Sequence, residues 1–182
     1  MIHEPLVSVV INCHNSDTYL REAIDSVINQ TYQNWELLFW DNNSTDKSAE
    51  IAKSYDQVKY FFNKNTVPLG EARQKASEYC SGEYLAYLDC DDFWYSDKLY
   101  KQIEIITSEE DIGFVYGKTD VLIQDTGSMR NFGTRKSLPE GKIFPDLIKE
   151  DFIPFPSALI DIKKFRKIGG FPINFINSPD YW

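Results

Sequence analysis

The chain has 182 residues, of which 42% are hydrophobic and 26% charged, a size and composition typical of one soluble domain with its own core. Its formal net charge of −9 disfavours binding to nucleic acid or to an anionic membrane through a basic surface. The same charge is compatible with a phosphorylated ligand held through a metal ion, because acidic side chains are then wanted at the site.

Neither a membrane span nor a secretion signal is apparent. The apolar runs are far shorter than the ~20 residues that a transmembrane helix needs, and the amino terminus lacks the basic and apolar regions of a signal peptide. Cys13, Cys80 and Cys90 are odd in number and lack paired spacing, which argues against a disulfide framework or a zinc site and favours a reducing compartment. We therefore expect a cytoplasmic protein and leave open a position at the inner face of the membrane.

Short apolar runs alternate with amphipathic helical patterns in the first part of the chain. The runs are rich in β-branched and aromatic residues and predict strands at 6–11, 35–40, 58–62, 84–88 and 112–116. The patterns between them predict helices at 17–29, 46–55 and 70–79, the last closed by Gly82, and one running from a cap at Ser96 or Asp97 to about residue 107. Strand starts about 23 to 29 residues apart are typical of strand–helix–strand units. We therefore predict an α/β fold with a mainly parallel sheet flanked by helices.

The pattern changes after residue 116. Residues 117–141 are polar and turn-prone and predict a hairpin or a mobile excursion, whereas the proline-punctuated run 152–161 predicts an edge strand. A short helix is expected at 163–168, ended by Gly169 and Gly170. A serine cap and a proline at 178–179 predict another helix start, and so few residues follow that we expect the chain to be part of a longer one.

Polar turns follow several of the predicted strands. In parallel α/β sheets, ligands bind beyond the carboxyl ends of the strands, so the turns 12–15, 41–46 and 89–92 are expected to form one site. Asp89 and Asp91 carry hard oxygen ligands suited to Mg²⁺ or Mn²⁺, and an ion held there could bridge a diphosphate. An EF-hand calcium loop is excluded, because Trp94 and Tyr100 stand where glycine and glutamate are required.

The remaining signals at this edge are individually weak. Asp41 could accept a hydrogen bond from a nucleobase, His14 could stack on the base, and Arg73 could meet phosphate, although each has an ordinary structural explanation. Cys13 and Cys90 could lie side by side next to the site, although buried, inert thiols are their more ordinary interpretation. The glycine-rich loops of dehydrogenases and P-loop proteins and the nucleophile elbow of hydrolases are absent.

Taken together, the motifs resemble those of the family 2 inverting glycosyltransferases. The resemblance covers nearly the whole chain and is carried by these segments: Val7–Asn15, Ser26–Tyr32, Glu36–Asp46, Gly82–Asp92, Gly169–Phe171 and Asp180. It implies a GT-A fold and transfer of a sugar, with inversion, from a nucleoside diphosphate donor, expected to be a UDP-sugar. The acceptor would be a saccharide or a lipid-linked saccharide in polysaccharide or glycan biosynthesis.

The resemblance also assigns roles to single residues. Asp41 would bind the base, with His14 in the place of a stacking tyrosine, and Asn12, Asn15 and Arg73 would lie near the nucleotide. Asp89 would approach the ribose or the metal, Asp91 would coordinate Mn²⁺ or Mg²⁺, and Asp180 would be the general base. One domain is expected, with a nucleotide-sugar part up to about residue 116 and an acceptor-side part over 117–182.

Departures from the family pattern leave alternatives open. Pro179 stands where a glutamate usually precedes the base, and His14 and Asn12 replace the usual residues, which affects the donor preference more than the fold. A nucleotide-sugar-binding domain without turnover and a nucleotidyltransferase on a similar sheet remain as alternatives. A phosphatase with an aspartyl nucleophile would carry its paired aspartates after the first strand instead of the fourth.

Overall fold

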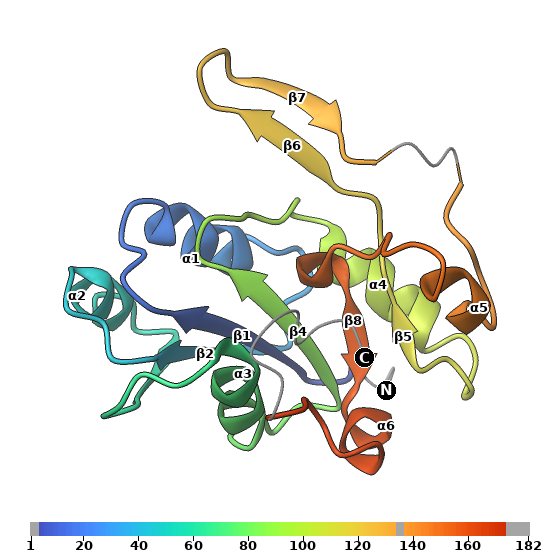
Figure 1. Ribbon diagram of the computed structural model, residues 1–182, viewed down its shortest axis with the longest axis horizontal. Coiled ribbons are helices and arrows are strands. Elements are labelled where there is room, and N and C mark those ends of the chain that lie inside the picture. Colours follow the sequence, from blue (N-terminus) through green and yellow to red (C-terminus); the bar gives the residue numbers. More distant parts are fainter. Residues whose placement is uncertain (1–3, 134–136, 174–182) are drawn as a thin grey trace.

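A computed structural model describes residues 4–133 and 137–173 of the chain. Its main sheet has six strands in the order β3-β2-β1-β4-β8-β5 (Figure 1). Neighbours among the first four run parallel, with these bounds: β1 (Val7–Cys13), β2 (Trp35–Asp41), β3 (Val58–Phe62) and β4 (Tyr84–Asp89). Beyond β4, the short strands β8 (Leu159–Asp161) and β5 (Phe114–Val115) pair antiparallel.

Helices cover both faces of this sheet (Figure 1). Alternate residues of β1 point to opposite faces, so that Val9 and Ile11 join one buried cluster and Val10 joins the other. The first cluster includes side chains of α1 (Leu20–Ile28), α2 (Ser48–Lys53) and α4 (Lys98–Ile106). The second includes side chains of α3 (Leu69–Ser77) and α6 (Ile162–Lys167). The predicted α/β fold, a mainly parallel sheet flanked by helices, is confirmed.

One predicted strand is misplaced. Residues 152–161 were expected to form an edge strand, but only Leu159–Asp161 is a strand, and it lies inside the sheet. Ile160 pairs with Leu85 of β4 on one side and with Phe114 of β5 on the other. The prolines that suggested an edge precede the strand, in the 3-10 turn η1 (Phe155–Ser157) and the residue before it. Their missing N–H groups therefore cost no hydrogen bond between strands.

Gly82, which was expected to close the helix predicted at 70–79, has another role. That helix ends at Ser77, and Gly82 lies just before β4. A Cβ at Gly82 would come 2.7 Å from Leu6 O and 2.7 Å from Ser8 N, so close approach to the backbone of β1 requires glycine here. By contrast, the expected end of α6 is confirmed, because Gly169 and Gly170 follow the helix with φ of 97° and 73°.

The predicted hairpin is also confirmed. Strands β6 (Asp120–Ile123) and β7 (Ser128–Asn131) pair antiparallel and project from the body of the molecule (Figure 1). A short helix, α5 (Phe144–Leu147), follows the hairpin. In the part of the chain that the structure describes, no helix has the length and apolar character needed to cross a bilayer.

Candidate nucleotide and metal site

The loops that follow β1 and β2 are hydrogen-bonded to each other. Asn42 N donates to Cys13 O at 2.8 Å, and His14 Nδ1 lies 2.9 Å from Asn42 O, so this ring nitrogen carries the proton. Asn15 Oδ1 accepts from Thr45 N at 2.8 Å, and its backbone adopts a positive φ of 53°. Two of the predicted turns therefore form one edge, with the His14 and Asn15 side chains exposed on it.

Asp41 ends β2 on the first-cluster face of the sheet and has no exposed surface. Its Oδ1 accepts from Ser44 N at 2.7 Å, and its Oδ2 accepts from Tyr60 Oη at 2.5 Å. Burial and the Asp41 carboxylate raise the pKa of Tyr60, so the phenol stays protonated and keeps donating. Each carboxylate oxygen retains a lone pair for a further donor.

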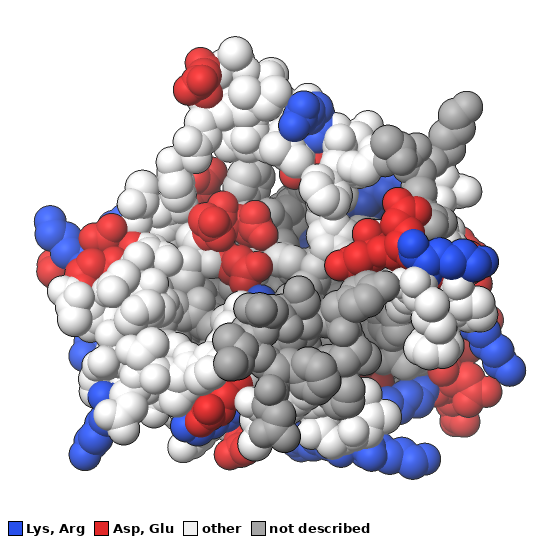
Figure 2. Space-filling model, in the orientation of Figure 1, with Lys and Arg blue, Asp and Glu red and all other residues white. Residues whose placement is uncertain are grey.

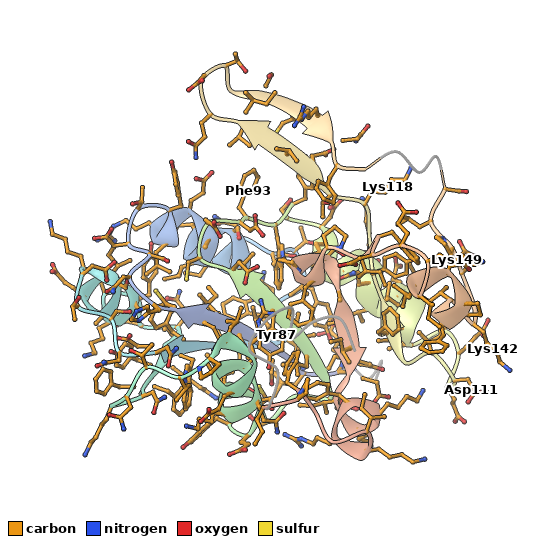
Figure 3. The ribbon with its side chains drawn as sticks, viewed as in Figure 1. Tyr87, Phe93, Asp111, Lys118, Lys142 and Lys149 are labelled. Atoms are coloured by element: carbon orange, nitrogen blue, oxygen red, sulfur yellow. The ribbon has the colours of Figure 1, made fainter. Side chains whose placement is uncertain are left out.

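Asp89 ends β4 on the opposite face and pairs with Arg73 of α3. Arg73 Nη2 lies 3.0 Å from Asp89 Oδ1, and the guanidinium carbon lies 4.4 Å from the centroid of the Phe155 ring. The Arg73 side chain is only 3% exposed, whereas that of Asp89 is 40% exposed. Tyr87, labelled in Figure 3 beside α3, donates from its hydroxyl to Arg73 O at 2.9 Å. Arg73 is thus a buried cation that forms an ion pair with the first residue of the acidic motif.

Asn12 lies between the other strand ends. In the sheet register it is opposite Trp40 of β2 and Asp89 of β4. Both polar atoms of its side chain are buried and have no hydrogen-bond partner among the described residues. Buried amides are nearly always paired, so a water molecule or a ligand is expected to bind here.

Residues 90–97, here called the acidic loop, connect β4 to α4 and carry Asp91 and Asp92. Asp92 N donates to Asp89 O at 3.2 Å, which folds the aspartates into one turn. Burial of its carboxyl group, with the negative charges of Asp89 and Asp91, raises the pKa of Asp92 to about 6. Figure 2 shows acidic side chains gathered in the middle of this face, and Figure 3 shows Phe93 of this loop on the side that faces the hairpin.

The carboxylates fit a divalent cation that brings other ligands with it. No cluster of three or more His, Cys, Asp or Glu side chains with the geometry of a metal site occurs in the described ranges. For Asp91, moreover, neither a hydrogen bond nor an ion pair is found there. One or two carboxylates are the usual protein contribution to Mg²⁺ bound with substrate phosphates, and Asp89 and Asp91 supply that set of hard oxygens.

The structure brings the Cys13 and Cys90 thiols together. Cys90 Sγ lies 3.2 Å from Asn12 O, and Cys13 and Cys90 are both buried and free. A hydrogen bond from Cys90 outweighs burial and lowers the pKa of Cys13 to about 7.

Asp180 and Pro179 lie outside the described residues, so the assignment of the general base stays a prediction. Two further residues, one bonded to Asp41 and one to the acidic loop, escaped the sequence analysis. Tyr60 lies in an ordinary apolar strand, and Gln30 follows an ordinary amphipathic helix. Only the resemblance singles out the segment that contains Gln30, and it assigns no role to that residue.

The sequence model of glycosyl transferase family 2 matches residues 8–169. The chain belongs to this family. TuaG of Bacillus subtilis, described as a candidate glycosyltransferase of teichuronic acid biosynthesis, is 31% identical over 170 residues, which cover 91% of this chain and 66% of TuaG. WfgD of Escherichia coli is named UDP-Glc:alpha-D-GlcNAc-diphosphoundecaprenol beta-1,3-glucosyltransferase and is 34% identical over 119 residues, 64% of this chain and 47% of WfgD. The chain thus spans between about half and two thirds of the length of these two relatives.

Solved structures show the same fold at low sequence identity. Residues 1–349 of Staphylococcus aureus TarS in complex with UDP superimpose with a TM-score of 0.71 at 18% identity, covering 96% of this chain and 52% of that TarS fragment. The mannosyltransferase PcManGT of Pyrobaculum calidifontis, in complex with GDP-Man and Mn²⁺, gives a TM-score of 0.72 at 16% identity and covers 98% of this chain and 51% of its own. The predicted family and the GT-A fold are confirmed.

Proposed function

We propose that the chain is the donor-binding region of a metal-assisted, inverting glycosyltransferase that uses a UDP-sugar. The observation that carries the proposal is the convergence of the polar loops after β1, β2 and β4 at one sheet edge, where Arg73 meets Asp89 and the acidic loop begins. Residues up to about 116 would bind the donor, and residues 117–182 would face the acceptor. Family membership and the nucleotide complexes of similarly folded proteins support this reading.

The nucleoside would be bound by the loops after β1 and β2. The Asp41 carboxylate, oriented by Ser44 and Tyr60, would accept the ring N–H of uracil. The exposed His14 ring, held by Asn42, would stack on the base, with Asn15 bordering the nucleotide. The unpaired amide of Asn12 would supply a donor and an acceptor to the ligand.

The diphosphate would be bound with Mg²⁺ or Mn²⁺ at Asp89 and Asp91. When bound, such an ion neutralises charge on the departing diphosphate. Arg73 would hold the Asp89 carboxylate in place, and Asp91 would bind the ion with its exposed carboxylate. We expect Asp180 to take the proton of the acceptor hydroxyl from the opposite side of the sugar, as an inverting displacement requires.

The acceptor is proposed from the relatives alone. TuaG is described with teichuronic acid biosynthesis, and WfgD is named for a diphosphoundecaprenol-linked acceptor. A saccharide or lipid-linked saccharide acceptor in polysaccharide biosynthesis is therefore the proposal for this protein. Nothing in its charge favours a nucleic acid partner.

Calorimetric titration of UDP with and without Mn²⁺ tests the donor site. We expect Mn²⁺ to tighten binding in the wild type and Asp91→Asn to abolish that gain. The matched control is Asp111→Asn, at an exposed aspartate labelled at the lower right of Figure 3, away from the acidic loop. This variant should keep the gain in UDP affinity that Mn²⁺ produces. A folded wild-type protein that binds no UDP would refute the uridine assignment. Binding of a UDP-sugar without turnover by the full-length protein would support the non-catalytic alternative.

A further inference from the structure

The acidic loop is hydrogen-bonded to the residues that follow α1. These contacts lie near the end of the loop that is farther from β4 along the chain. Thr31 N donates to Ser96 O at 2.7 Å, and the preceding residue, Gln30, reaches the same stretch with its side chain. Gln30 is 1% exposed, so its amide has to be satisfied by protein groups. The hydrogen-bond partners of this amide are therefore the groups that Gln30 holds in place.

Each polar atom of the Gln30 side chain is hydrogen-bonded. Nε2 donates to Ser26 O of α1 at 3.0 Å and to Tyr95 O of the acidic loop at 2.8 Å. Oε1 accepts from Leu99 N of α4 at 3.0 Å. A single side chain thus joins α1 to the end of the acidic loop and to the beginning of the next helix.

The bond to Leu99 replaces the helix cap that the sequence suggested. Asp97 is the N-cap residue of α4, yet its side chain makes no capping hydrogen bond and instead pairs with Lys101 at 2.5 Å. The first N–H groups of a helix have no partner within the helix, and Leu99 N is one of them. Gln30, in the segment that follows α1, therefore caps α4 and fixes where the acidic loop ends.

The contacts of Gln30 counteract electrostatic repulsion among the aspartates where β4 meets the acidic loop. Asp89, Asp91 and Asp92 share one turn, and like charges at such short range favour conformations that separate them. β4 fixes the start of the loop, and Trp94 Nε1 donates to Pro156 O at 2.9 Å in its middle. Gln30 fixes the end, so that the carboxylates stay together in the absence of a cation.

We propose that Gln30 is a positioning residue for metal-dependent donor binding: it holds the acidic loop in the shape that presents Asp89 and Asp91 to the cation. The inference rests on the proposed function and adds a determinant that touches neither nucleotide nor metal. Substitution of residues that orient the metal-binding side chains without contacting the metal typically weakens metal binding by about 10- to 100-fold.

The test is the UDP titration with and without Mn²⁺ on Gln30→Met, which preserves volume and removes the hydrogen bonds. We expect the Mn²⁺-dependent gain in UDP affinity to fall at least tenfold. UDP affinity without Mn²⁺ should stay within about twofold of the wild type, because the loops after β1 and β2 do not depend on this anchor. Gln30→Asn, whose amide is one carbon too short to reach Tyr95 and Leu99 together, provides a second variant should Gln30→Met fail to fold.

Ser8→Ala is the control for a general loss of stability. Ser8 is fully buried, donates to Glu36 Oε1 at 2.5 Å and accepts from Gly82 N at 2.9 Å, near the amino end of β1 and away from the acidic loop. It should lower stability and leave the Mn²⁺-dependent gain unchanged. A gain retained in folded Gln30→Met, or lost equally in Ser8→Ala, would overturn the inference. A wild type without any gain would overturn the proposed metal site as well, which separates the two failures.

Discussion

Glu36 provides the sharpest test of how the sheet is held together at the edge opposite the candidate site. Its side chain is 6% exposed. The carboxylate accepts from Ser8 Oγ at 2.5 Å, from Ser81 N at 2.7 Å, from Ser81 Oγ at 2.9 Å and from Lys59 Nζ at 2.7 Å. Glutamine at this position has one acceptor oxygen, and its NH₂ group would face donors.

The magnitude follows from these contacts. Lys59 is 57% exposed, so solvent screens its pairing with Glu36 and the pair contributes little. The donors of Ser8, which is fully buried, and of Ser81 matter more, because hydrogen bonds to charged groups contribute about 1.5–3 kcal/mol each. We expect Glu36→Gln to lower the free energy of unfolding at pH 7 by about 2–4 kcal/mol. UDP affinity should not change, because these contacts lie near the amino ends of the strands.

Urea denaturation at pH 7 and at pH 3.5 checks both the size and the origin of this loss. Burial acts to raise the pKa of Glu36, but the hydrogen bonds from Lys59, Ser8 and Ser81 outweigh it and lower the pKa. A lowered folded-state pKa contributes stability above the unfolded value, and this stability is lost as the pH falls through the folded-state value. The gap between wild type and Glu36→Gln should therefore shrink at pH 3.5. The reasoning would be refuted if Glu36→Gln lowered the free energy of unfolding at pH 7 by less than ~1 kcal/mol, the usual limit for a surface pair. A loss no larger than that of the exposed control Glu109→Gln would refute it as well.

Two further predictions concern stability. Gly82→Ala should lower the free energy of unfolding by about 2–4 kcal/mol, because its Cβ would meet backbone atoms of Leu6 and Ser8. Gly117→Ala, which has nothing within 4 Å of the added carbon, is the matched control, and equal urea midpoints would contradict the explanation. Burial lowers the pKa of Lys98 to about 7, so its charged form costs stability at neutral pH and the cost fades as the pH rises toward the unfolded value of 10.5. The stability of the wild type relative to Lys98→Met should accordingly rise by about 1–2 kcal/mol between pH 7 and pH 9, and a constant difference would count against a buried ammonium.

Much of the fold could be predicted because its signals are local. The strand at 58–62 was predicted to the residue, and the hairpin followed from polar, turn-prone composition. Strand β8 was misplaced because proline content describes the chain next to a strand, whereas its position between β4 and β5 depends on pairing with distant residues. Gly82 was misread for the same reason, since its constraint comes from the backbone of β1.

The sequence by itself determined the α/β fold, the family and the edge of the sheet where the candidate site lies. Hydrophobic periodicity and the residues that follow each strand are properties of contiguous segments, and parallel strands bring their carboxyl ends to one edge. Only the tertiary structure decided that Tyr60 orients Asp41, 19 residues away, that Arg73 holds Asp89, 16 residues away, and that Gln30 caps a helix 69 residues further along. These contacts join residues whose local patterns are ordinary, and they arise because packing of the helices on the sheet leaves each buried polar group a small choice of partners.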